Sequence, residues 1–325
     1  MKAIVHHTYG SPDLLEFQDV DKPVAKDDEL LVRVHASSVN PADWYRVAGT
    51  PYVGRMGGGL RRPKVKAAGL DFAGQVEAIG RKVTGFQPGD EVFGARLGAY
   101  AEYLCVRATK VAPKPANVTF EQAAAVPVAA LTALQGLRDT GRIRSGQRVL
   151  INGASGGVGT FAVQVAKSFG AHVTGVCSTR NVDLVRSIGA DEVVNYTRQD
   201  FTGDGQRYDL IFDAVGNRSV ADRRRALSPT GILVVVGGPK GGRWLGPATA
   251  LFKVIPATLI GRQKLRAKLS TLVREDLLAL RDLLAAGTIV PVIDRRYPLS
   301  GVPEALGYLG EGHARGKIVI DVSPA

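Results

Sequence analysis

The spacing of apolar residues changes character along the chain. In the first 120 residues, stretches such as ELLVRVHASSV (29–39) and FAGQVEAIG (72–80) alternate apolar and polar positions, as half-buried strands do. GFQPGDEVFG (85–94) places glycine and proline around a further short strand, which is typical of tight turns. We therefore expect this part of the chain to be rich in strands and turns.

A helix is predicted next, and an alternating pattern follows it. The segment TFEQAAAVPVAALTALQGL begins at Thr119, which can cap a helix, and Gln122 can complete a capping box. From residue 147 short apolar runs alternate with amphipathic helical patterns, as expected for a doubly wound parallel sheet covered on both faces. The predicted strands are QRVLING, HVTGVC, DLIFDAV and GILVVVGG, and the predicted helices are TFAVQVAKSFG, NVDLVRSIGA and SVADRRRAL.

After about residue 265 the pattern changes again. TLVREDLLALRDLLAAG predicts a helix that ends at Gly287, where a C-cap glycine belongs. VPVID (290–294) and GKIVIDV (316–322) are two final strand candidates that return to the earlier β character. A chain of 325 residues is long enough for two domains of ordinary size. The fold class expected from these patterns is α/β.

Composition fits a globular protein without a membrane segment. Hydrophobic residues make up 45% and charged residues 22% of the chain. Its two cysteines, Cys105 and Cys177, cannot form a disulfide framework or a paired-cysteine zinc site, so a cytoplasmic location is the simplest expectation. No secretory signal is visible in MKAIVHHTYGS. The apolar stretch 245–261 is interrupted by two prolines and a lysine, so we expect no membrane span there.

A formal net charge of +12 raises the question of a phosphate-bearing partner. Basic patches can attract RNA. Solvated surface is the favoured interpretation, because no RNA-binding module accompanies the basic clusters, and RNA binding stays as the alternative. The clusters are RRPKVK (61–66), RRR (223–225), RQKLRAK (262–268) and Arg295–Arg296.

The most informative motif is INGASGGVG, between a predicted strand and a predicted helix. Gly153, Gly156 and Gly159 give a G-x-x-G-x-x-G variant of the dinucleotide-binding turn. Such glycines allow the tight turn, the approach of backbone to a pyrophosphate and close helix–strand packing. The helix N-terminus then offers N–H groups to phosphates. Glycine turns also join strands to helices for structural reasons alone, but this context favours binding. The remaining candidates in this turn are Ser155, Gly157 and Val158.

The end of the next predicted strand, VTGVCSTRN, indicates which coenzyme is preferred. A site that prefers NAD would place a carboxylate here to bind the ribose, but no acidic residue occurs before Asp183. Ser178, Thr179 and Arg180 can instead bind a 2′-phosphate, which predicts NADPH over NADH. The alternative is an exposed helix start with a solvated arginine. Further candidates at strand ends are Val215, Gly216, Asn217, Gly237 and Gly238.

With these motifs in place, nearly the whole chain resembles the medium-chain dehydrogenase/reductase superfamily. It is most similar to the zinc-independent branch, the zeta-crystallin-like quinone oxidoreductases and the enone reductases. The resemblance implies a GroES-like catalytic domain formed by 1–122 and 266–325, a Rossmann NADP-binding domain at 123–265, and a homodimer. The matching segments are SVNPADWYRVAG, AAGLDFAGQVEAIGRKVTGFQPGDEVFG, GAYAEYLCV, AAAVPVAALTAL, INGASGGVG, GADEVVNY, FDAVG and HARGKIVIDV.

Departures from the zinc-binding relatives predict a site without metal. Those relatives carry a cysteine in the stretch occupied here by VNPAD, and Gly-His-Glu where this chain has Gly69-Leu70-Asp71. Asn40, Leu70 and the scattered histidines do not form a thiolate and imidazole set suited to zinc.

Four further site residues rest on the resemblance. Asn40 and Tyr45 match positions near the cofactor and are the catalytic candidates. Asn40 is equally well explained as a turn residue before proline, and Tyr45 as a packing partner of Trp44. Thr132 matches a residue at the nicotinamide end, with a helix hydroxyl bonded back to the chain as its alternative. Tyr196 resembles a residue beside the adenosine 2′-phosphate.

These features predict an NADPH-dependent, metal-free reductase of quinones or α,β-unsaturated carbonyls, which accept hydride without a strong Lewis acid. One alternative is an NAD(P)-dependent alcohol or aldehyde oxidoreductase. Another is an RNA-binding or crystallin-like protein that retains nucleotide binding. The glycine-rich, basic stretch at 50–69 is either a wall of the substrate pocket or a flexible loop.

Overall fold

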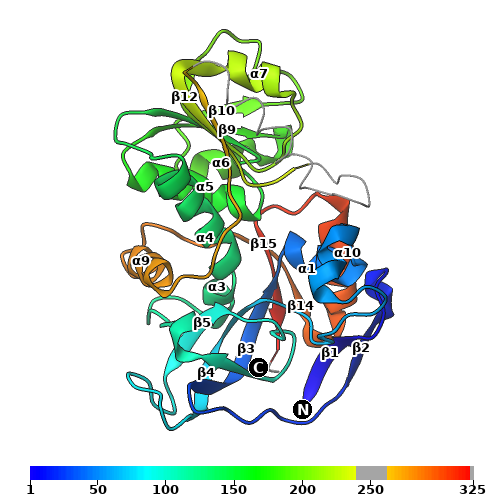
Figure 1. Cartoon of the computed structure of the whole chain (residues 1–325). Coiled ribbons are helices and arrows are strands. Elements are labelled where there is room, and N and C mark those ends of the chain that lie inside the picture. The colour runs from blue at the N-terminus through cyan, green and yellow to red at the C-terminus, as the bar shows by residue number, and fades with distance from the viewer. Residues whose placement is uncertain (239–261, 323–325) are drawn as a thin grey trace. The chain divides into compact units, whose positions relative to one another are not determined.

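The computed structural model describes residues 1–238 and 262–322, and they form two compact units (Figure 1). Unit 1 contains residues 1–129 and the chain from Leu272 onward, and unit 2 contains Ala130–Thr271. The boundaries expected from the sequence, after 122 and after 265, fall a few residues earlier. Strand β13 (Lys264–Ala267) continues across the second of them as part of the unit 2 sheet.

Unit 2 is built on a six-stranded parallel sheet with the order β10-β9-β8-β11-β12-β13. This order reverses between β8 and β11, as in a doubly wound Rossmann sheet. The central strand residues Val149, Leu150 and Ile151 are fully buried, as expected when both faces of a parallel sheet are covered. The remaining strands are β8 (Arg148–Asn152), β9 (His172–Cys177), β10 (Glu192–Asn195), β11 (Tyr208–Asp213) and β12 (Leu227–Val235).

The helices of unit 2 follow the predicted alternation. Helix α5 (Gly157–Ser168) follows β8, α6 (Val182–Ser187) follows β9, and α7 (Val220–Arg225) follows β11. Strands β10 and β13 were not predicted. Both are only four residues long, which is too short for a distinct hydrophobic pattern.

Unit 1 contains a larger, mainly antiparallel sheet with the order β14-β15-β3-β4-β5-β7, and β6 also pairs with β3. Strands β3 (blue) and β15 (red) lie side by side in Figure 1 although the chain between them is long, and Ile318 pairs with Val39. A separate pair is formed by β1 and β2. The bounds are β1 (Lys2–His6), β2 (Leu15–Asp19), β3 (Glu29–Val39), β4 (Asp71–Ile79), β5 (Glu91–Ala95), β6 (Tyr103–Arg107), β7 (Val111–Pro113), β14 (Ile293–Pro298) and β15 (Lys317–Asp321).

The predicted helix over 119–137 is divided in the structure. Thr119 caps α3 (Phe120–Ala124), and the capping box is present because the Gln122 backbone N–H donates to Thr119 Oγ1 and Gln122 Oε1 accepts from the Thr119 N–H. Helix α4 (Pro127–Gln135) then starts anew at its proline, which lacks the N–H needed to continue a helix. Helix α3 lies in unit 1, and α4 crosses from unit 1 into unit 2 after Ala129. The other described α-helices of unit 1 are α1 (Pro41–Ala48), α2 (Arg55–Gly58), α9 (Arg274–Ala285) and α10 (Val302–Glu311).

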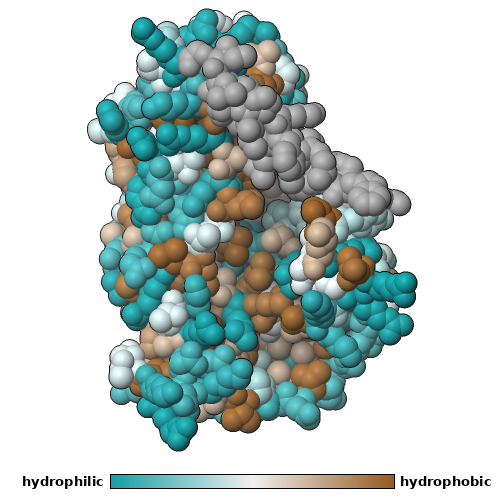
Figure 2. All heavy atoms as spheres, viewed as in Figure 1, coloured by the Kyte–Doolittle hydropathy of each residue, from teal (hydrophilic) through white to brown (hydrophobic). Residues whose placement is uncertain are grey.

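Hydrophilic side chains cover most of the described part of the face that Figure 2 shows, and hydrophobic residues emerge in smaller groups between them. Within the described ranges, no helix is both long and apolar enough to span a membrane. The expectation for 245–261 falls outside the described residues.

Candidate functional site

The glycine-rich turn joins β8 to α5 and has the geometry of a phosphate cradle. Gly153 has a φ of +88°, a conformation that L side chains rarely adopt. A Cβ atom at Gly159 would lie 1.9 Å from the carbonyl oxygen of Gly153, so only glycine permits this approach of helix to turn. A Cβ at Gly156 would meet one atom, 3.5 Å away. The N-terminus of α5 therefore faces space that a ligand phosphate can use.

The end of β9 is tied to this turn by a side chain that the sequence analysis did not select. Asn181 Nδ2 donates to Ser155 Oγ at 2.9 Å and to Ser178 Oγ at 3.2 Å. Its Oδ1 is buried and has no hydrogen-bond partner among the described residues. Asn181 thus links two predicted coenzyme residues and leaves an acceptor available. Its position at the start of the predicted helix NVDLVRSIGA, close to the end of the predicted strand, was the signal that could have identified it.

Thr179, Arg180 and Tyr196 lie at the same edge of the sheet, because β9 pairs with β10. The Tyr196 N–H donates to Cys177 O at 3.0 Å, and Thr179 Oγ1 lies 2.9 Å from Thr197 Oγ1. Arg180 is exposed, and Tyr196 keeps 51% of its surface exposed. This edge therefore brings together hydroxyls, a cation and an aromatic ring.

A buried polar network joins the two strands where the sheet order reverses. Asp213, at the end of β11, accepts hydrogen bonds from the N–H groups of Val215 and Gly216 at 3.0 and 2.8 Å, and from Asn152 Nδ2 at 2.9 Å. Its other oxygen accepts from Arg223 at 2.7 Å, in an ion pair buried on both sides. Asn152, Asp213 and Arg223 were not predicted, although a polar residue ending an apolar strand is a readable signal.

The remaining predicted strand-end residues lie near this network. Asn217 Oδ1 accepts from Asn152 Nδ2 at 3.1 Å. A Cβ atom at Gly237 would lie 2.3 Å from Ala214 O, so glycine is required by close packing. Gly238 is half-buried at the last described position before the gap. Arg223 also shows that the basic cluster 223–225 is not simply a solvated surface.

Thr132 lies on α4 and is nearly buried. Its Oγ1 donates to Ser270 Oγ at 3.0 Å. Neighbouring Gln135 exchanges hydrogen bonds with the backbone of Thr271. The hydroxyl of Thr132 therefore binds a residue far away in sequence, which neither the cofactor interpretation nor the helix-hydroxyl alternative had considered.

In unit 1, Asn40 is buried and both ends of its amide are engaged. Asn40 Nδ2 donates to Asp71 Oδ2 at 2.9 Å, and Asn40 Oδ1 accepts from Lys317 Nζ at 2.6 Å. The Asn40 backbone N–H donates to Asp43 Oδ2 at 2.9 Å at the start of α1. Asn40 therefore connects the loop after β3 to β4 and β15.

The charges of this cluster are strongly perturbed by burial. Burial raises the pKa of Asp71, and Lys317 partly offsets that effect. Burial also lowers the pKa of Lys317. Asp43 has a pKa raised to about 7, first by burial and then by the charge of Asp71. Its Oδ1 is buried without a hydrogen-bond partner among the described residues. Two carboxyl groups thus share one ammonium group, Lys317, in a site from which water is largely excluded.

These side chains do not fit a zinc ion. Both polar ends of the Asn40 side chain are already bonded, and the Leu70 side chain has no donor atom for a metal. Zinc prefers thiolate, imidazole and carboxylate donors in a tetrahedral set. Among the described residues, no group of three or more His, Cys, Asp or Glu side chains is placed to hold a metal.

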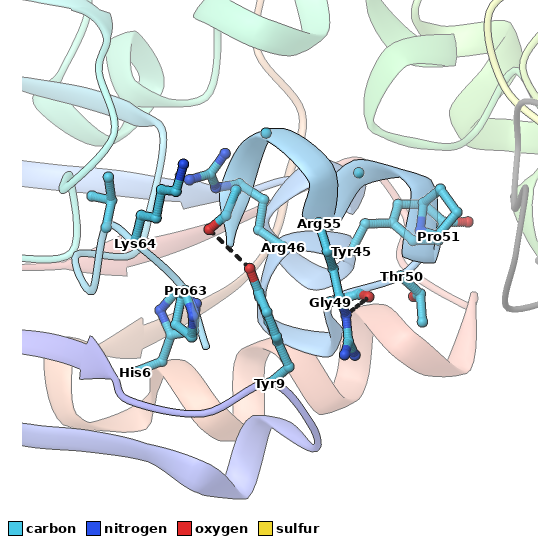
Figure 3. A pocket seen from close by; sticks show the side chains of 14 residues that line it. His6, Tyr9, Tyr45, Arg46, Gly49, Thr50, Pro51, Arg55, Pro63 and Lys64 are labelled. Carbon is cyan, nitrogen blue, oxygen red and sulfur yellow. Dashed lines mark hydrogen bonds between the residues drawn. The ribbon is translucent and has the colours of Figure 1, made fainter. Parts of the chain in front are cut away.

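Tyr45 projects from α1 and lines a cavity of about 500 Å³ within unit 1 (Figure 3). Its ring packs edge-on against Trp44, with centroids 5.3 Å apart, so the structure contains the contact that the packing alternative expected, and the catalytic role of Tyr45 stays a prediction. Partial burial raises the pKa of its hydroxyl. Tyr45 therefore stays protonated at neutral pH and can donate a hydrogen bond.

Two family models match the chain. The alcohol dehydrogenase GroES-like domain matches residues 26–116, and the zinc-binding dehydrogenase model matches residues 188–320. The second description names zinc, whereas the described part of the chain has no group of three or more His, Cys, Asp or Glu side chains placed to hold a metal ion. The two models together place the chain among the dehydrogenases with a GroES-like and a Rossmann domain.

Relatives and solved structures narrow the family. The 2-methylene-furan-3-one reductase of Solanum lycopersicum is 33% identical to this chain, and the alignment covers 100% of this chain and 80% of the length of that reductase. A chloroplastic quinone-oxidoreductase homolog of Spinacia oleracea is 33% identical to this chain, and the alignment covers 99% of this chain and 98% of the length of that homolog. The structure of the Escherichia coli quinone oxidoreductase complexed with NADPH aligns with this chain with a TM-score of 0.80 at 27% sequence identity. The alignment covers 99% of this chain and 100% of that structure's chain. Together with the parallel sheet and the glycine turn, these matches show that the chain belongs to the quinone oxidoreductase and enone reductase branch of the medium-chain dehydrogenase/reductase superfamily.

Proposed function

We propose that this protein is an NADPH-dependent reductase that transfers hydride to quinones or α,β-unsaturated carbonyls without a metal ion. The observation that carries this proposal is the coenzyme edge of unit 2. There the cradle at Gly153–Gly159 adjoins Ser178, Thr179 and Arg180, with no carboxylate before Asp183. Further support comes from relatives named as quinone and enone reductases, and from a similar enzyme crystallised with NADPH.

The residues of unit 2 would hold the coenzyme by complementary chemistry. The first N–H groups of α5 favour the pyrophosphate. Arg180, with the hydroxyls of Ser178 and Thr179, favours a 2′-phosphate, which a carboxylate would repel. Val215, Gly216 and Asn217 are fixed by Asp213 and Asn152 at the sheet reversal, where a Rossmann ligand binds. When bound, NADPH supplies the hydride.

Tyr45 is the proposed polar group of the acceptor site. Its neutral hydroxyl can donate to a carbonyl oxygen, which stabilises the negative charge that develops there as hydride arrives at carbon. Asn40 is proposed to act as a positioning residue, because its backbone caps α1 through Asp43 and its side chain is fixed by Asp71 and Lys317. Helix α1 then carries Tyr45.

Unit 1 is proposed as the catalytic domain and unit 2 as the NADP-binding domain. The homodimeric state and the cytoplasmic location stay predictions. The RNA-binding alternative stays untested.

A panel of quinones, enones, alcohols and aldehydes tests the proposal, with each compound assayed in parallel with NADPH and NADH. We expect turnover of quinones or enones, a preference for NADPH, and no loss of activity after dialysis against a chelator. Turnover confined to alcohols and aldehydes, together with a stoichiometric metal that activity requires, would instead establish the alcohol or aldehyde oxidoreductase.

A further inference from the structure

The cavity beside Tyr45 has a one-sided charge. Its fourteen lining residues include the cations Arg46, Arg55 and Lys64, and the described residues contribute no aspartate or glutamate to its lining. Such a cavity attracts anions, since fields from like charges add in a concave site with low-dielectric walls. Its volume of about 500 Å³ lies within the range typical of small-molecule sites.

Arg55 is held in a fixed orientation. Its Nε donates to the Gly49 carbonyl oxygen at 2.7 Å. Its guanidinium carbon lies 4.4 Å from the centroid of the Tyr9 ring and 4.7 Å from that of the Tyr52 ring. Because these contacts leave terminal N–H groups for other partners, Arg55 is preorganised as a donor.

Arg46 and Lys64 complete the charge of the cavity. In Figure 3 both side chains end on the same side of the pocket, although Arg46 belongs to α1 and Lys64 to the loop before β4. Neither side chain forms an ion pair or hydrogen bond with any residue that the structure describes. The Lys64 loop is itself anchored, because the Lys64 N–H donates to Gly58 O at 2.8 Å and Tyr9 Oη donates to the same oxygen at 3.0 Å.

His6 forms another part of the wall and stays neutral. Burial lowers the pKa of its imidazole, and the charge of Arg46 acts in the same direction. Its Nδ1 lies 3.1 Å from Lys66 O, which accepts the proton of Nδ1 and leaves Nε2 as an acceptor. That Nε2 is buried with no partner among the described residues. The positive charge of the cavity at neutral pH therefore comes from the three cations.

We propose that this cavity selects acceptors in which the conjugated ketone or quinone carries an anionic group, such as a carboxylate, sulfonate or phosphate. Arg46 and Lys64 bind the anion, Arg55 assists, and the tyrosine rings pack against the conjugated part. This inference rests on the proposed function, because it names the class of acceptor that the reductase prefers.

The test compares 1,4-naphthoquinone with its 2-sulfonate in the wild-type enzyme and in R46M/K64M. We expect kcat/KM for the sulfonate to fall about tenfold in the double variant, as the loss of two exposed charge contacts implies. The value for the neutral quinone should change less than about twofold on the same reasoning. The charge-conserving variant R46K/K64R should keep most of the sulfonate activity.

The matched control is R61M/R62M, which removes the same charge from the same loop at two exposed residues that do not line the cavity. An equal sulfonate loss in this control would reduce the effect to general electrostatic steering and overturn the proposal. An equal loss for both quinones in R46M/K64M would also overturn it.

Direct binding separates this inference from the proposed function. Naphthalene-2-sulfonate cannot be reduced in this reaction, so its affinity measured by calorimetry does not depend on turnover. If neither quinone is reduced but R46M/K64M still weakens this binding about tenfold, the reductase assignment fails while the anion site stands. Unchanged binding in R46M/K64M means that the anion site is wrong.

Discussion

Replacing Lys317 by methionine removes the ammonium group that neutralises the buried cluster in unit 1. Lys317 is 2% exposed. Its Nζ donates to Asn40 Oδ1 at 2.6 Å and to Val39 O at 3.2 Å, and it lies 3.5 Å from Asp71 Oδ2. Methionine has a similar length and is apolar, so the main change is electrostatic rather than steric.

The expected loss follows from what remains around Asp71. Removing one partner of a buried ion pair costs about 3–5 kcal/mol. Asp71 keeps three donors, namely Ser38 Oγ at 2.9 Å, Asn40 Nδ2 at 2.9 Å and the Val128 N–H at 3.0 Å. These donors hold part of its charge, so we expect the lower end, about 3 kcal/mol in the free energy of unfolding.

The loss must also depend on pH. Burial already raises the pKa of Asp71 and raises that of Asp43 to about 7. Without the Lys317 ammonium both values rise further, so protonation neutralises the uncompensated charge at a higher pH. A carboxyl whose pKa is raised on folding stabilises the folded state at low pH, and this contribution is lost as pH rises through the folded pKa. K317M should therefore be closest to wild type near pH 5.5 and furthest from it near pH 8.

Urea unfolding followed by tryptophan emission measures the effect. The chain has two tryptophans, so the W244F background leaves Trp44 on α1 as a reporter for unit 1. K82M, an exposed lysine exchange, is the charge control, and K317M/D71N should recover part of the loss because it also removes the orphaned charge. A loss below about 1 kcal/mol, a loss independent of pH, or a double variant as unstable as K317M would refute this reasoning.

Three further changes test the coenzyme and acceptor sites. R180A should lower the affinity for NADPH about tenfold, as loss of a charge-assisted contact implies, and leave the affinity for NADH nearly unchanged. R186A on α6 is the control, and an equal loss of affinity for both coenzymes in R180A contradicts the 2′-phosphate role. G159A should lower both the thermal midpoint and NADPH affinity, because its Cβ would lie 1.9 Å from a backbone oxygen, whereas G156A should lower affinity alone; identical stability losses would sink this distinction. Y45F should lower kcat about tenfold with NADPH affinity preserved, and unchanged steady-state kinetics would remove Tyr45 from the reaction.

The fold could be predicted where local pattern and local chemistry agree. The predicted strand over 29–39 coincides with β3, but the expected half-buried strand is buried on both faces apart from Arg33 and His35. Gly287 has a φ of +66° just after α9, as a C-cap glycine should. The pattern was less accurate in two places: Pro127 divides the predicted helix, and β14 begins at Ile293, so that it overlaps VPVID (290–294) only in the last two residues of that segment.

The candidate site was predictable only for its contiguous parts. The glycine turn and the Ser178–Arg180 segment are read from neighbouring residues. The partners of Asn40 could not be predicted, because Lys317 lies 277 positions and Asp71 lies 31 positions away from it in the sequence. The same reason hid the pairing of Asp213 with Asn152, which are 61 positions apart. Long-range hydrogen bonds leave no periodic signal in a sequence.

The pairing of β15 with β3 has a consequence for biosynthesis. Unit 2 is one continuous stretch of chain, Ala130–Thr271, and it can condense while the ribosome is still translating. Unit 1 cannot, since the neighbour of Val39 in the sheet is Ile318. Its N-terminal part must wait, with β3 lacking one partner, until β15 (Lys317–Asp321) has emerged. Nascent chains arrested before residue 316 should therefore have a protease-resistant middle and a protease-sensitive beginning.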